Sequence, residues 1–405
     1  MRVSFWVLAA GLFVSSLAAQ AAAPDPRNWN GVLAEARGQT VYFHAWGGEP
    51  RINDYLQWAG DIVEERFGVR VVHVKVSDTA EVVSRVLTEK AAGRNEGGAV
   101  DLVWINGENF AAMKREGLLL SDPWATELPN YRFVDVENKP TVASDFTIPV
   151  EGQESPWGMA KLVFSHDAAH FADPPRSAAA LADWIEQNPG RFTYPQPPDF
   201  LGLTLLKQLL VELTPDAAVL QQPVRDDSFA AATAPLFAWL DATKPNLWRQ
   251  GRAYPANTAD LRRLLADGEV EISFAFNRAD ASSAIVDGEL PGTVRSVVFP
   301  AGTLGNTHFV AIPFNANAAA GAMVLADFLL SPEAQARKED PDVWGDPTVL
   351  ALAKLAPEDQ ARFTALELGV ATLPPDRLGP VLPEPHPSWV ERIEHEWARR
   401  YGVNQ

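Results

Sequence analysis

Hydrophobic positions in the first third of the chain alternate between the spacing of strands and the spacing of helices. Residues 41–45 form an apolar, β-branched run, and apolar and polar residues alternate over 69–76, as in half-buried strands. Between these two runs, Ile52, Leu56 and Val63 recur at helical spacing. The pattern therefore predicts a strand, a helix and a second strand, in that order.

Local start and stop signals extend this order along the chain. Gly68 is typical of a helix end, and Asp78 with Glu81 three residues later predicts a capping box that opens a second helix. A third strand is predicted at 100–105, followed by a short helix that ends at Gly117. Strands and helices that alternate in this way favour an α/β fold, with a parallel sheet covered by helices.

The alternation resumes after a proline-rich, irregular stretch at 121–156. The segment "SPWGMAKLVFSHD" is predicted to be extended. The elements predicted after it are helices at 178–187, 199–213, 258–266 and 279–287, a helix that ends at 330, and strands at 191–194, 270–276, 293–299 and 307–312. The last part of the chain is expected to form helices joined by proline-rich loops.

Two α/β units with extended segments between them predict two lobes that share hinge strands. A mature chain of about 380 residues is also longer than one hydrophobic core normally holds. We expect a first lobe formed by 24–155 and 305–335, and a second lobe formed by 156–304 and 336–405.

The N-terminal sequence "MRVSFWVLAAGLFVSSLAAQAAAPDP" is typical of a cleavable secretory signal peptide, predicted at 1–21. One basic residue precedes an apolar run, and Ala19-Gln20-Ala21 fits an Ala-x-Ala cleavage site. The run is shorter than the ~20 residues of a bilayer span, although an N-terminal membrane anchor is the alternative. The mature protein is therefore expected to be exported, with no direct membrane insertion.

The composition excludes several classes of partner and site. The formal net charge is −18, and removing Arg2 with the leader gives −18 − 1 = −19, which disfavours nucleic acid and anionic lipid as partners. There is no cysteine, which excludes a thiol nucleophile, a thiolate metal site and a lipid-modified cysteine. A chain of this length can bury a core without disulfides. These features favour a Gram-negative periplasm.

No motif in the sequence supplies a catalytic set. It contains no Gly-x-Ser-x-Gly elbow, phosphate loop, His-Glu-x-x-His zinc helix or Gly-x-Gly-x-x-Gly fingerprint. Only His166 and His170 are close in sequence, and they lie at a predicted strand end, so no metal and no cofactor are expected. An exported hydrolase with a carboxylate pair in the same cleft is the alternative to a non-enzymatic binding protein. A structural or adhesive exported protein is a third hypothesis.

The candidate ligand site consists of small, polar and aromatic residues at the ends of predicted strands and at the hinge. In an open α/β sheet, ligands bind outside the carboxyl ends of the strands, near helix N-termini. Glycine allows close backbone approach, amides orient a ligand, and aromatic faces cover its apolar or cationic parts. The predicted ligand-binding residues are Trp46, Gly47, Gly48, Asn106, Glu108, Asn109, Trp157, Tyr194, Gln196, Asp199, Asn277 and Arg278.

Several of these residues have a structural alternative. Trp46 would then be a core residue at a strand end, and Asn106 and Asn109 would cap the helix that follows them. Asp199 would be the N-cap of its helix, and Arg278 would be a solvated charge or a partner for Asp280. These alternatives stay open at the level of the sequence.

Five segments, in the same order, resemble extracellular solute-binding proteins of ABC importers, and more narrowly their YnjB-type branch. The matching segments are "WGG", "HVKVSDTAEVVSRVLTEKAAG", "GGAVDLVWINGENFAAMKREGLL", "SPWGMAKLVFSHD" and "FLLSPEAQARKE". The resemblance implies a type II periplasmic-binding fold, in which two lobes close on a small-molecule solute in an interlobe cleft. It also implies hinge strands near 157–164 and 307–313, a monomer, and delivery of the solute to a membrane permease with its ATPase.

The chemistry of the ligand is left open by these observations. Relatives in the broader group bind thiamine, polyamines, ferric iron, sulfate or sugars, and the lack of an adjacent tyrosine pair counts against iron. Acidic and aromatic residues at the predicted strand ends suit an organic cation such as thiamine or a polyamine. Arg278 and the helix N-termini would instead suit an anion.

Overall fold

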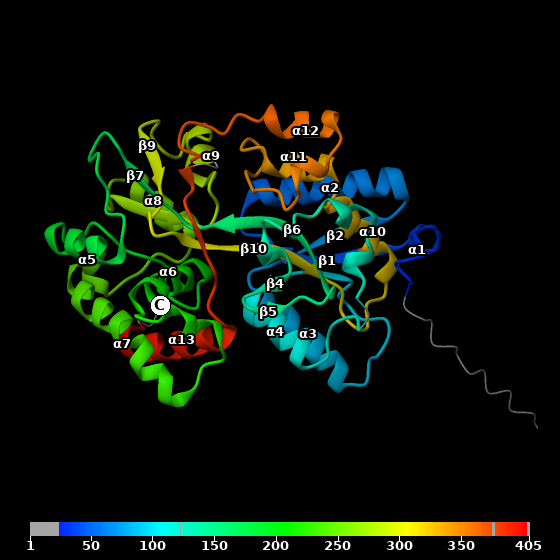
Figure 1. Cartoon of the computed structure of the whole chain (residues 1–405), viewed down its shortest axis with the longest axis horizontal. Helices are drawn as coiled ribbons and strands as arrows, with labels where there is room; N and C mark the ends of the chain where they lie inside the picture. Colours follow the sequence, from blue (N-terminus) through cyan, green and yellow to red (C-terminus); the bar gives the residue numbers. More distant parts are fainter. Residues whose placement is uncertain (1–23, 122, 375–376, 403–405) are drawn as a thin grey trace, which may run out of the picture.

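The computed structural model describes residues 24–121, 123–374 and 377–402 and contains two α/β lobes (Figure 1). The strands are β1 (Thr40–Trp46), β2 (Arg70–Val76), β3 (Leu102–Ile105), β4 (Ser144–Asp145), β5 (Ile148–Pro149), β6 (Glu154–Lys161), β7 (Val163–Asp167), β8 (Ile272–Ala275), β9 (Val294–Val297), β10 (Thr303–Ala311) and β11 (Val381–Leu382). The α-helices are α1 (Trp29–Ala36), α2 (Pro50–Phe67), α3 (Thr79–Ala91), α4 (Gly107–Arg115), α5 (Ala178–Gln187), α6 (Phe200–Leu213), α7 (Asp226–Thr243), α8 (Thr258–Ala266), α9 (Asp280–Val286), α10 (Ala319–Leu329), α11 (Pro332–Glu339), α12 (Pro357–Thr364) and α13 (Pro387–Tyr401). The predicted leader lies outside the described residues.

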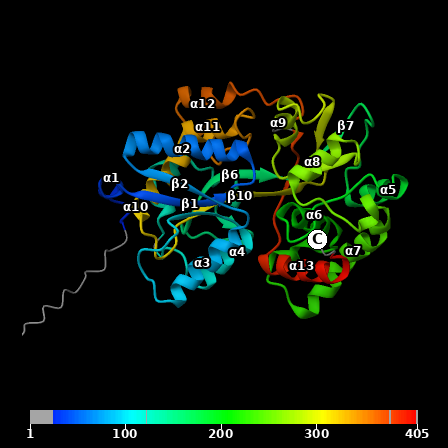
Figure 2. The ribbon, with the colours of Figure 1, turned by 180° about the vertical axis from the view of Figure 1, so that it is seen from behind.

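The sheet of the first lobe has the strand order β11-β10-β3-β1-β2, and β6 also pairs with β10. The predicted parallel pairing is confirmed for β1, β2 and β3. In contrast, β10 runs antiparallel to both β3 and β6. The carboxyl ends of β1 and β3 therefore lie at the same edge of the sheet, which faces the second lobe in both views (Figures 1 and 2).

Helix α2 illustrates how the sequence pattern becomes structure in this lobe. Its apolar side, which includes Ile52, Leu56 and Val63, is buried in the first core cluster. Full burial of each such side chain contributes about 1.5–3 kcal/mol. The helix ends at Gly68, whose φ of 69° is left-handed and whose N–H bonds to the carbonyl of Glu64, as a glycine end signal predicts.

The predicted capping box of the next helix is only half correct. Asp78 is the N-cap of α3 and accepts a hydrogen bond from the N–H of Ala80 at 2.8 Å. Glu81 does not close the box, because its carboxylate accepts a bond from the hydroxyl of Ser77 at 2.7 Å instead. The N-terminus of α3 is therefore capped by one side chain, with Glu81 still favourable in the first turn.

The second lobe contains a small antiparallel sheet in which β7 lies between β8 and β9. Helix α7 was missed by the sequence analysis, and its residues Leu236 and Phe237 belong to the core of this lobe. The strand predicted at 191–194 is absent. This stretch is held as an irregular segment by the ion pair of Arg191 with Glu271 at 2.9 Å and by the bond from the Trp248 N–H to the Phe192 carbonyl at 2.8 Å.

Two strand connections pass between the lobes. Strand β6 continues into β7 after one residue, and β9 leads into β10, which pairs with β6 over most of its length. These crossings agree with the predicted hinge region, although β10 begins at Thr303, earlier than the sequence pattern indicated. Among the described residues, no helix is long and apolar enough to span a bilayer.

The packing of the C-terminal region differs from the predicted lobe boundaries. Helices α11 and α12 lie beside α2 (Figure 1), and Trp344, Leu350 and Phe363 belong to the core of the first lobe. Trp344 packs against two aromatic rings of this core: its ring centroid lies 5.6 Å from that of Tyr55 and 5.3 Å from that of Trp157. Within the predicted range 336–405, α13 packs in the core of the second lobe.

Candidate functional site

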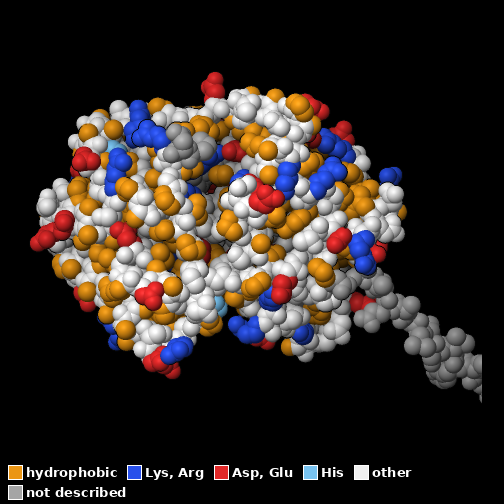
Figure 3. Space-filling view, viewed as in Figure 1, with side chains coloured by type: hydrophobic (Ala, Val, Ile, Leu, Met, Phe, Trp, Pro, Cys, Tyr) orange, Lys and Arg blue, Asp and Glu red, His pale blue; other side chains and the backbone are white. Residues whose placement is uncertain are grey.

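The two lobes face each other across a groove, which Figure 3 shows on one face of the molecule. The first lobe contributes the ends of β1 and β3 and the N-terminus of α4. The second lobe contributes the start of α6, the end of β8 and helix α9. Two sets of contacts join these surfaces.

The first set, here called the interlobe latch, joins residues 339–346 of the first lobe to residues 277–287 of the second. Arg278 forms an ion pair with Glu339, with Nη2 2.6 Å from Oε1. The side-chain amide of Asn277 donates to the carbonyl of Trp344 at 3.0 Å. Both predicted residues therefore contact the other lobe, and Arg278 is a buried ion-pair partner of Glu339 rather than a solvated charge.

A pocket lies beside the latch and is lined by both lobes. Its lining residues are Glu49, Arg51, Ile52 and Trp344 from the first lobe, and Arg262, Asn277, Asp280, Ser283, Ala284 and Asp287 from the second. Its volume is about 40 Å³, whereas small-molecule sites are usually about 300–1,000 Å³. In this arrangement of the lobes the pocket is too small for a nutrient, so a solute requires the lobes to separate.

Four of the five charged residues that line this pocket form ion pairs with each other. Arg51 donates to Asp287 with its Nη2 at 2.6 Å, and Arg262 contacts Asp280 and Glu289, both at 2.8 Å. Burial raises the pKa of Glu49 above its usual value, and the charge of Arg262 opposes this effect. The lining residues thus include three carboxyl groups and two arginines, so the pocket carries one more acidic group than basic groups.

The second set of contacts forms a cage around one ammonium group. The Lys207 Nζ lies 2.8 Å from the Glu384 carboxylate, 4.5 Å from the ring centroid of Phe146 and 5.3 Å from that of Phe200. Phe146 comes from the β4–β5 turn of the first lobe, whereas Phe200 and Lys207 lie on α6 of the second. The cage is therefore interlobe, and we define it by these four residues together with Glu108 and Asp145.

Carboxyl groups outnumber the single cation of the cage. Burial raises the pKa of Glu108, and the charge of Lys207 opposes the rise. Burial also raises the pKa of Asp145 well above its usual value, although its carboxylate accepts a bond from the Gly107 N–H at 2.7 Å. Among the described residues, the other oxygen of Asp145 is buried without a hydrogen-bond partner. The cage thus has acceptor capacity that one ammonium does not fill.

Sequence reasoning found Glu108 but missed Lys207, Phe146 and Glu384. A signal for Lys207 exists, because it is a lysine within the mainly apolar helix sequence "FLGLTLLKQLLVEL". Lysine is seldom fully buried unless it is paired, so a lysine in an all-round apolar helix predicts a buried partner. Glu384 is distant in sequence and carries no comparable signal.

At the end of β1, the predicted residues pack closely against one another and against a neighbouring strand. The Trp46 side chain is 39% exposed at the interlobe edge. A Cβ on Gly48 would lie 2.4 Å from the Trp46 ring, and one on Gly47 would lie 2.6 Å from the Cβ of Lys75. The two glycines are therefore required by close packing within the lobe, whereas Trp46 remains available to a ligand.

The asparagines of α4 lie at the helix N-terminus as the sequence indicated. Asn106 occupies the N-cap position, but its side chain makes no capping bond and instead donates to the Thr307 carbonyl on hinge strand β10. Asn109 is half-buried, and its N–H bonds to the Asn106 carbonyl at 3.2 Å. Asn106 thus ties the end of β3 to the hinge.

Two predicted ligand contacts, Trp157 and Tyr194, are buried in this arrangement of the lobes. Trp157 is 0% exposed and stacks on Tyr55, with ring centroids 6.4 Å apart. Tyr194 is 1% exposed, packs 5.3 Å from Tyr254, and accepts a bond from the indole of Trp397 at 3.1 Å. In this arrangement the aromatic rings at these two positions pack in the cores of the lobes.

At the start of α6, Asp199 is the helix N-cap, which was the structural alternative. Its carboxylate accepts bonds from the N–H groups of Leu201 at 2.8 Å and Gly202 at 3.1 Å. Burial raises its pKa, and these bonds oppose the rise. Gln196 is half-buried, and its carbonyl accepts from the Asp199 N–H at 3.1 Å.

A buried network that the sequence did not reveal lies beneath the latch. Lys338 Nζ contacts Asp346 at 2.5 Å, and His308 on β10 contacts the other oxygen of Asp346 at 3.0 Å. Burial lowers the pKa of Lys338 and raises that of Asp346, but the charge of Lys338 and the bond from His308 leave the pKa of Asp346 lowered overall. Gly158 on β6 provides the space for this network.

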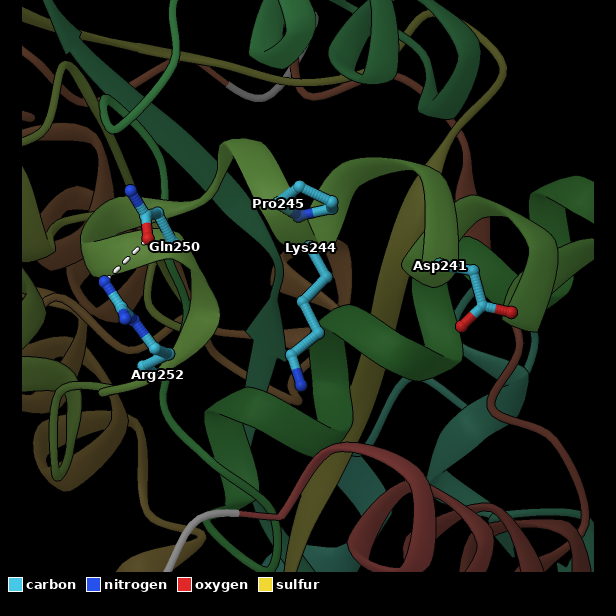
Figure 4. Close-up of a pocket in the computed structure, with 5 residues that line it drawn as sticks. All are labelled: Asp241, Lys244, Pro245, Gln250 and Arg252. Atoms are coloured by element: carbon cyan, nitrogen blue, oxygen red, sulfur yellow. Dashed lines mark hydrogen bonds between the residues drawn. The ribbon is translucent and has the colours of Figure 1, made fainter.

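Another pocket, of about 410 Å³, lies wholly within the second lobe (Figure 4). It is lined by Asp241, Lys244, Pro245, Gln250 and Arg252. Figure 4 shows Arg252 turned toward Gln250, to which it donates at 2.6 Å, whereas Asp241 lies apart from them. Among the described residues, those that line this pocket all belong to the second lobe, so lobe closure does not act on its contents.

Neither a metal centre nor an acid–base pair is evident in the described part of the chain. It contains no group of three or more His, Asp or Glu side chains that could hold a metal ion. Asp145 and Glu154 are both fully buried carboxyls, and burial raises the pKa of each well above its usual value. Neither carboxyl contacts solvent in this arrangement of the lobes.

The fold and the interlobe surfaces define a two-lobe solute-binding protein. The model of the family "Bacterial extracellular solute-binding protein" matches residues 52–358, so the chain belongs to this family. The chain is 45% identical over 404 residues to Protein YnjB of Escherichia coli (strain K12), with 100% of both chains covered. The expected family membership is thereby confirmed.

Solved structures support the same fold at low sequence identity. The periplasmic binding protein AfuA from Actinobacillus pleuropneumoniae superposes with a TM-score of 0.61 at 14% identity, covering 90% of this chain and 99% of that one. The spermidine/putrescine substrate-binding protein PotD from Streptococcus pneumoniae gives a TM-score of 0.57 at 13% identity, covering 89% and 99%. The predicted type II periplasmic-binding fold is confirmed.

Proposed function

We propose that this protein captures an organic cation between its lobes in the periplasm and delivers it unchanged to a membrane permease and its ATPase. Solute-binding proteins of ABC importers work with such a permease and ATPase, which supports the partners. The interlobe cage is the observation that carries the ligand class. The Lys207 ammonium there forms an ion pair with Glu384, and its charge also acts on the carboxyl groups of Glu108 and Asp145.

The physical case for a cation rests on the walls of the cage. Phenyl faces attract an ammonium through their quadrupole, and the attraction grows when the ammonium is desolvated. Phe200 is 48% exposed, so one wall of the cage opens toward solvent. Carboxyls that are buried near each other gain from a second positive charge, because their mutual repulsion then falls.

The comparisons alone leave the ligand class open. The structure of AfuA is described with bound fructose-6-phosphate, an anion, and PotD is described as a spermidine/putrescine binder, and both share the fold. Ligand class therefore has to come from the residues of the cage. An anion-binding function would need basic groups in excess, and Lys207 is the cation that the structure places in the cage.

The test is calorimetric titration of the mature protein with putrescine, spermidine and thiamine, against fructose-6-phosphate and sulfate. A cation is expected to bind at one site, and Glu108→Gln is expected to weaken it about tenfold or more, since it removes a half-buried charge. Glu186→Gln, which removes an exposed carboxylate on α5, is the matched control and should leave the affinity unchanged. The ligand should be recovered with its mass unaltered.

Two results would contradict the proposal. Binding of the anions alone would exclude a cationic ligand. A covalent change in the recovered ligand would instead indicate an enzyme in the same groove.

A further inference from the structure

The position of Lys207 suggests more than a supporting role in the cage. Its side chain is 2% exposed, and its ammonium lies between two phenyl rings and against a carboxylate. These are the contacts that an organic cation would make in the same place. The protein's own lysine therefore occupies the site proposed for the solute.

The contacts of this ammonium divide between the lobes. Phe200 and Lys207 share helix α6, and Glu384 lies close to the hinge strand, where the Asn306 side chain contacts it at 3.3 Å. Phe146 belongs to the first lobe, where its ring packs so closely over Gly107 that an added Cβ would lie 2.7 Å away. The contact between Lys207 and Phe146 can therefore exist only when the lobes are together.

We propose that the Lys207 ammonium is a built-in occupant of the cage, which closes the lobes without solute and competes with a cationic solute for the same position. Lobe closure then does not require ligand, and the latch contacts form in the empty protein. A solute binds only to molecules whose cage is free, so the apparent Kd equals the intrinsic Kd divided by the fraction that is free. The competition, though not the closure, rests on the proposed cationic ligand.

The experiment measures closure in the absence of any ligand. The chain has no cysteine, so Glu65→Cys on α2 and Asp183→Cys on α5, both exposed, give one spin-label pair that spans the lobes. Lys207→Met removes the charge and keeps an unbranched side chain that is one heavy atom shorter. We expect it to lower the closed-to-open ratio about tenfold, which corresponds to about 1.4 kcal/mol, as read from the distance distribution.

A second variant and a matched control keep the result interpretable if Lys207→Met folds poorly. Phe146→Leu removes the first-lobe ring without touching any charge and should open the lobes in the same direction. Lys244→Met removes a lysine that lies 5.3 Å from the Tyr401 ring within the second lobe, and it should leave the distances unchanged. Circular dichroism and melting temperature identify variants that are folded.

Affinity for spermidine and thiamine gives the second readout. Lys207→Met is expected to bind the cation about tenfold more tightly, because the competitor is gone. Unchanged distances in both Lys207→Met and Phe146→Leu would overturn the proposal, as would weaker cation binding by Lys207→Met. If the wild type binds no cation at all, the proposed function fails, and the ligand-free distances still decide whether Lys207 closes the lobes.

Discussion

The burial of two ion pairs between the lobes, one in the latch and one beside it, predicts how strongly each pair favours closure. Glu339→Gln breaks the pair with Arg278, and Asp287→Asn breaks the pair with Arg51. Both changes replace an acid by its amide and raise the net charge by one, so they form a matched pair. In each case the partner arginine becomes hydrated when the lobes separate, so the open forms of the two variants are alike. The two variants are therefore expected to differ in the free energy of the closed form.

The exposed fractions of these side chains determine how much free energy each substitution is expected to cost. Arg278 and Glu339 are 4% and 16% exposed, whereas Arg51 and Asp287 are 19% and 45% exposed. Removing one partner of a buried pair costs about 3–5 kcal/mol, and an exposed pair contributes about 0.2–1 kcal/mol. Because a glutamine can still accept one bond from Arg278, we expect Glu339→Gln to cost about 2 kcal/mol, or about 30-fold in the closed-to-open ratio. For Asp287→Asn we expect about twofold.

The spin-label pair on α2 and α5 measures both ratios in ligand-free protein. The Glu339→Gln sample should show a larger population at the open distance than the Asp287→Asn sample. Ligand affinity should fall in the same order, since a solute that binds the closed form then has to offset the lost contact. Equal opening by the two variants would refute the argument from burial, and no opening by either would show that these contacts do not hold the lobes together.

Two further predictions concern stability. Gly158→Ala would place a Cβ 1.9 Å from Asp346 Oδ2 and 2.9 Å from Lys338 Nζ, so it should displace this buried pair and cost about 3–5 kcal/mol in urea unfolding. Burial raises the pKa of Asp327 from 3.8 to about 6, although bonds from Asn130 oppose the rise. Because the folded pKa is the higher one, the protonated carboxyl stabilises the folded protein; this stabilisation is complete below the unfolded pKa and is lost as pH rises through about 6. From pH 7 to pH 5, the free energy of unfolding of the wild type should therefore rise by about 1 kcal/mol relative to that of Asp327→Asn.

The sequence predicted the elements that depend on local pattern better than those that depend on distant partners. Helix α5 occupies the predicted residues because its apolar spacing and the Ser177 cap are both local. Helix α7 was missed, and it contains Pro235, a residue that argues against a helix interior when read alone. The segment at 191–194 is apolar enough for a strand, but its carbonyls accept bonds from the backbone N–H groups of Glu271 and Trp248, which lie outside the strands of the sheet.

The same limit explains which site residues the sequence could find. Strand ends such as Trp46, Asn106 and Asn277 were found because the rule that places ligands there depends only on chain order in an α/β fold. The cage depends on Lys207 meeting Glu384, residues from segments that become neighbours only after β11 pairs with β10. No periodicity links two such segments, so the chemistry that distinguishes this site from others on the same fold lies in contacts that a single sequence does not encode locally.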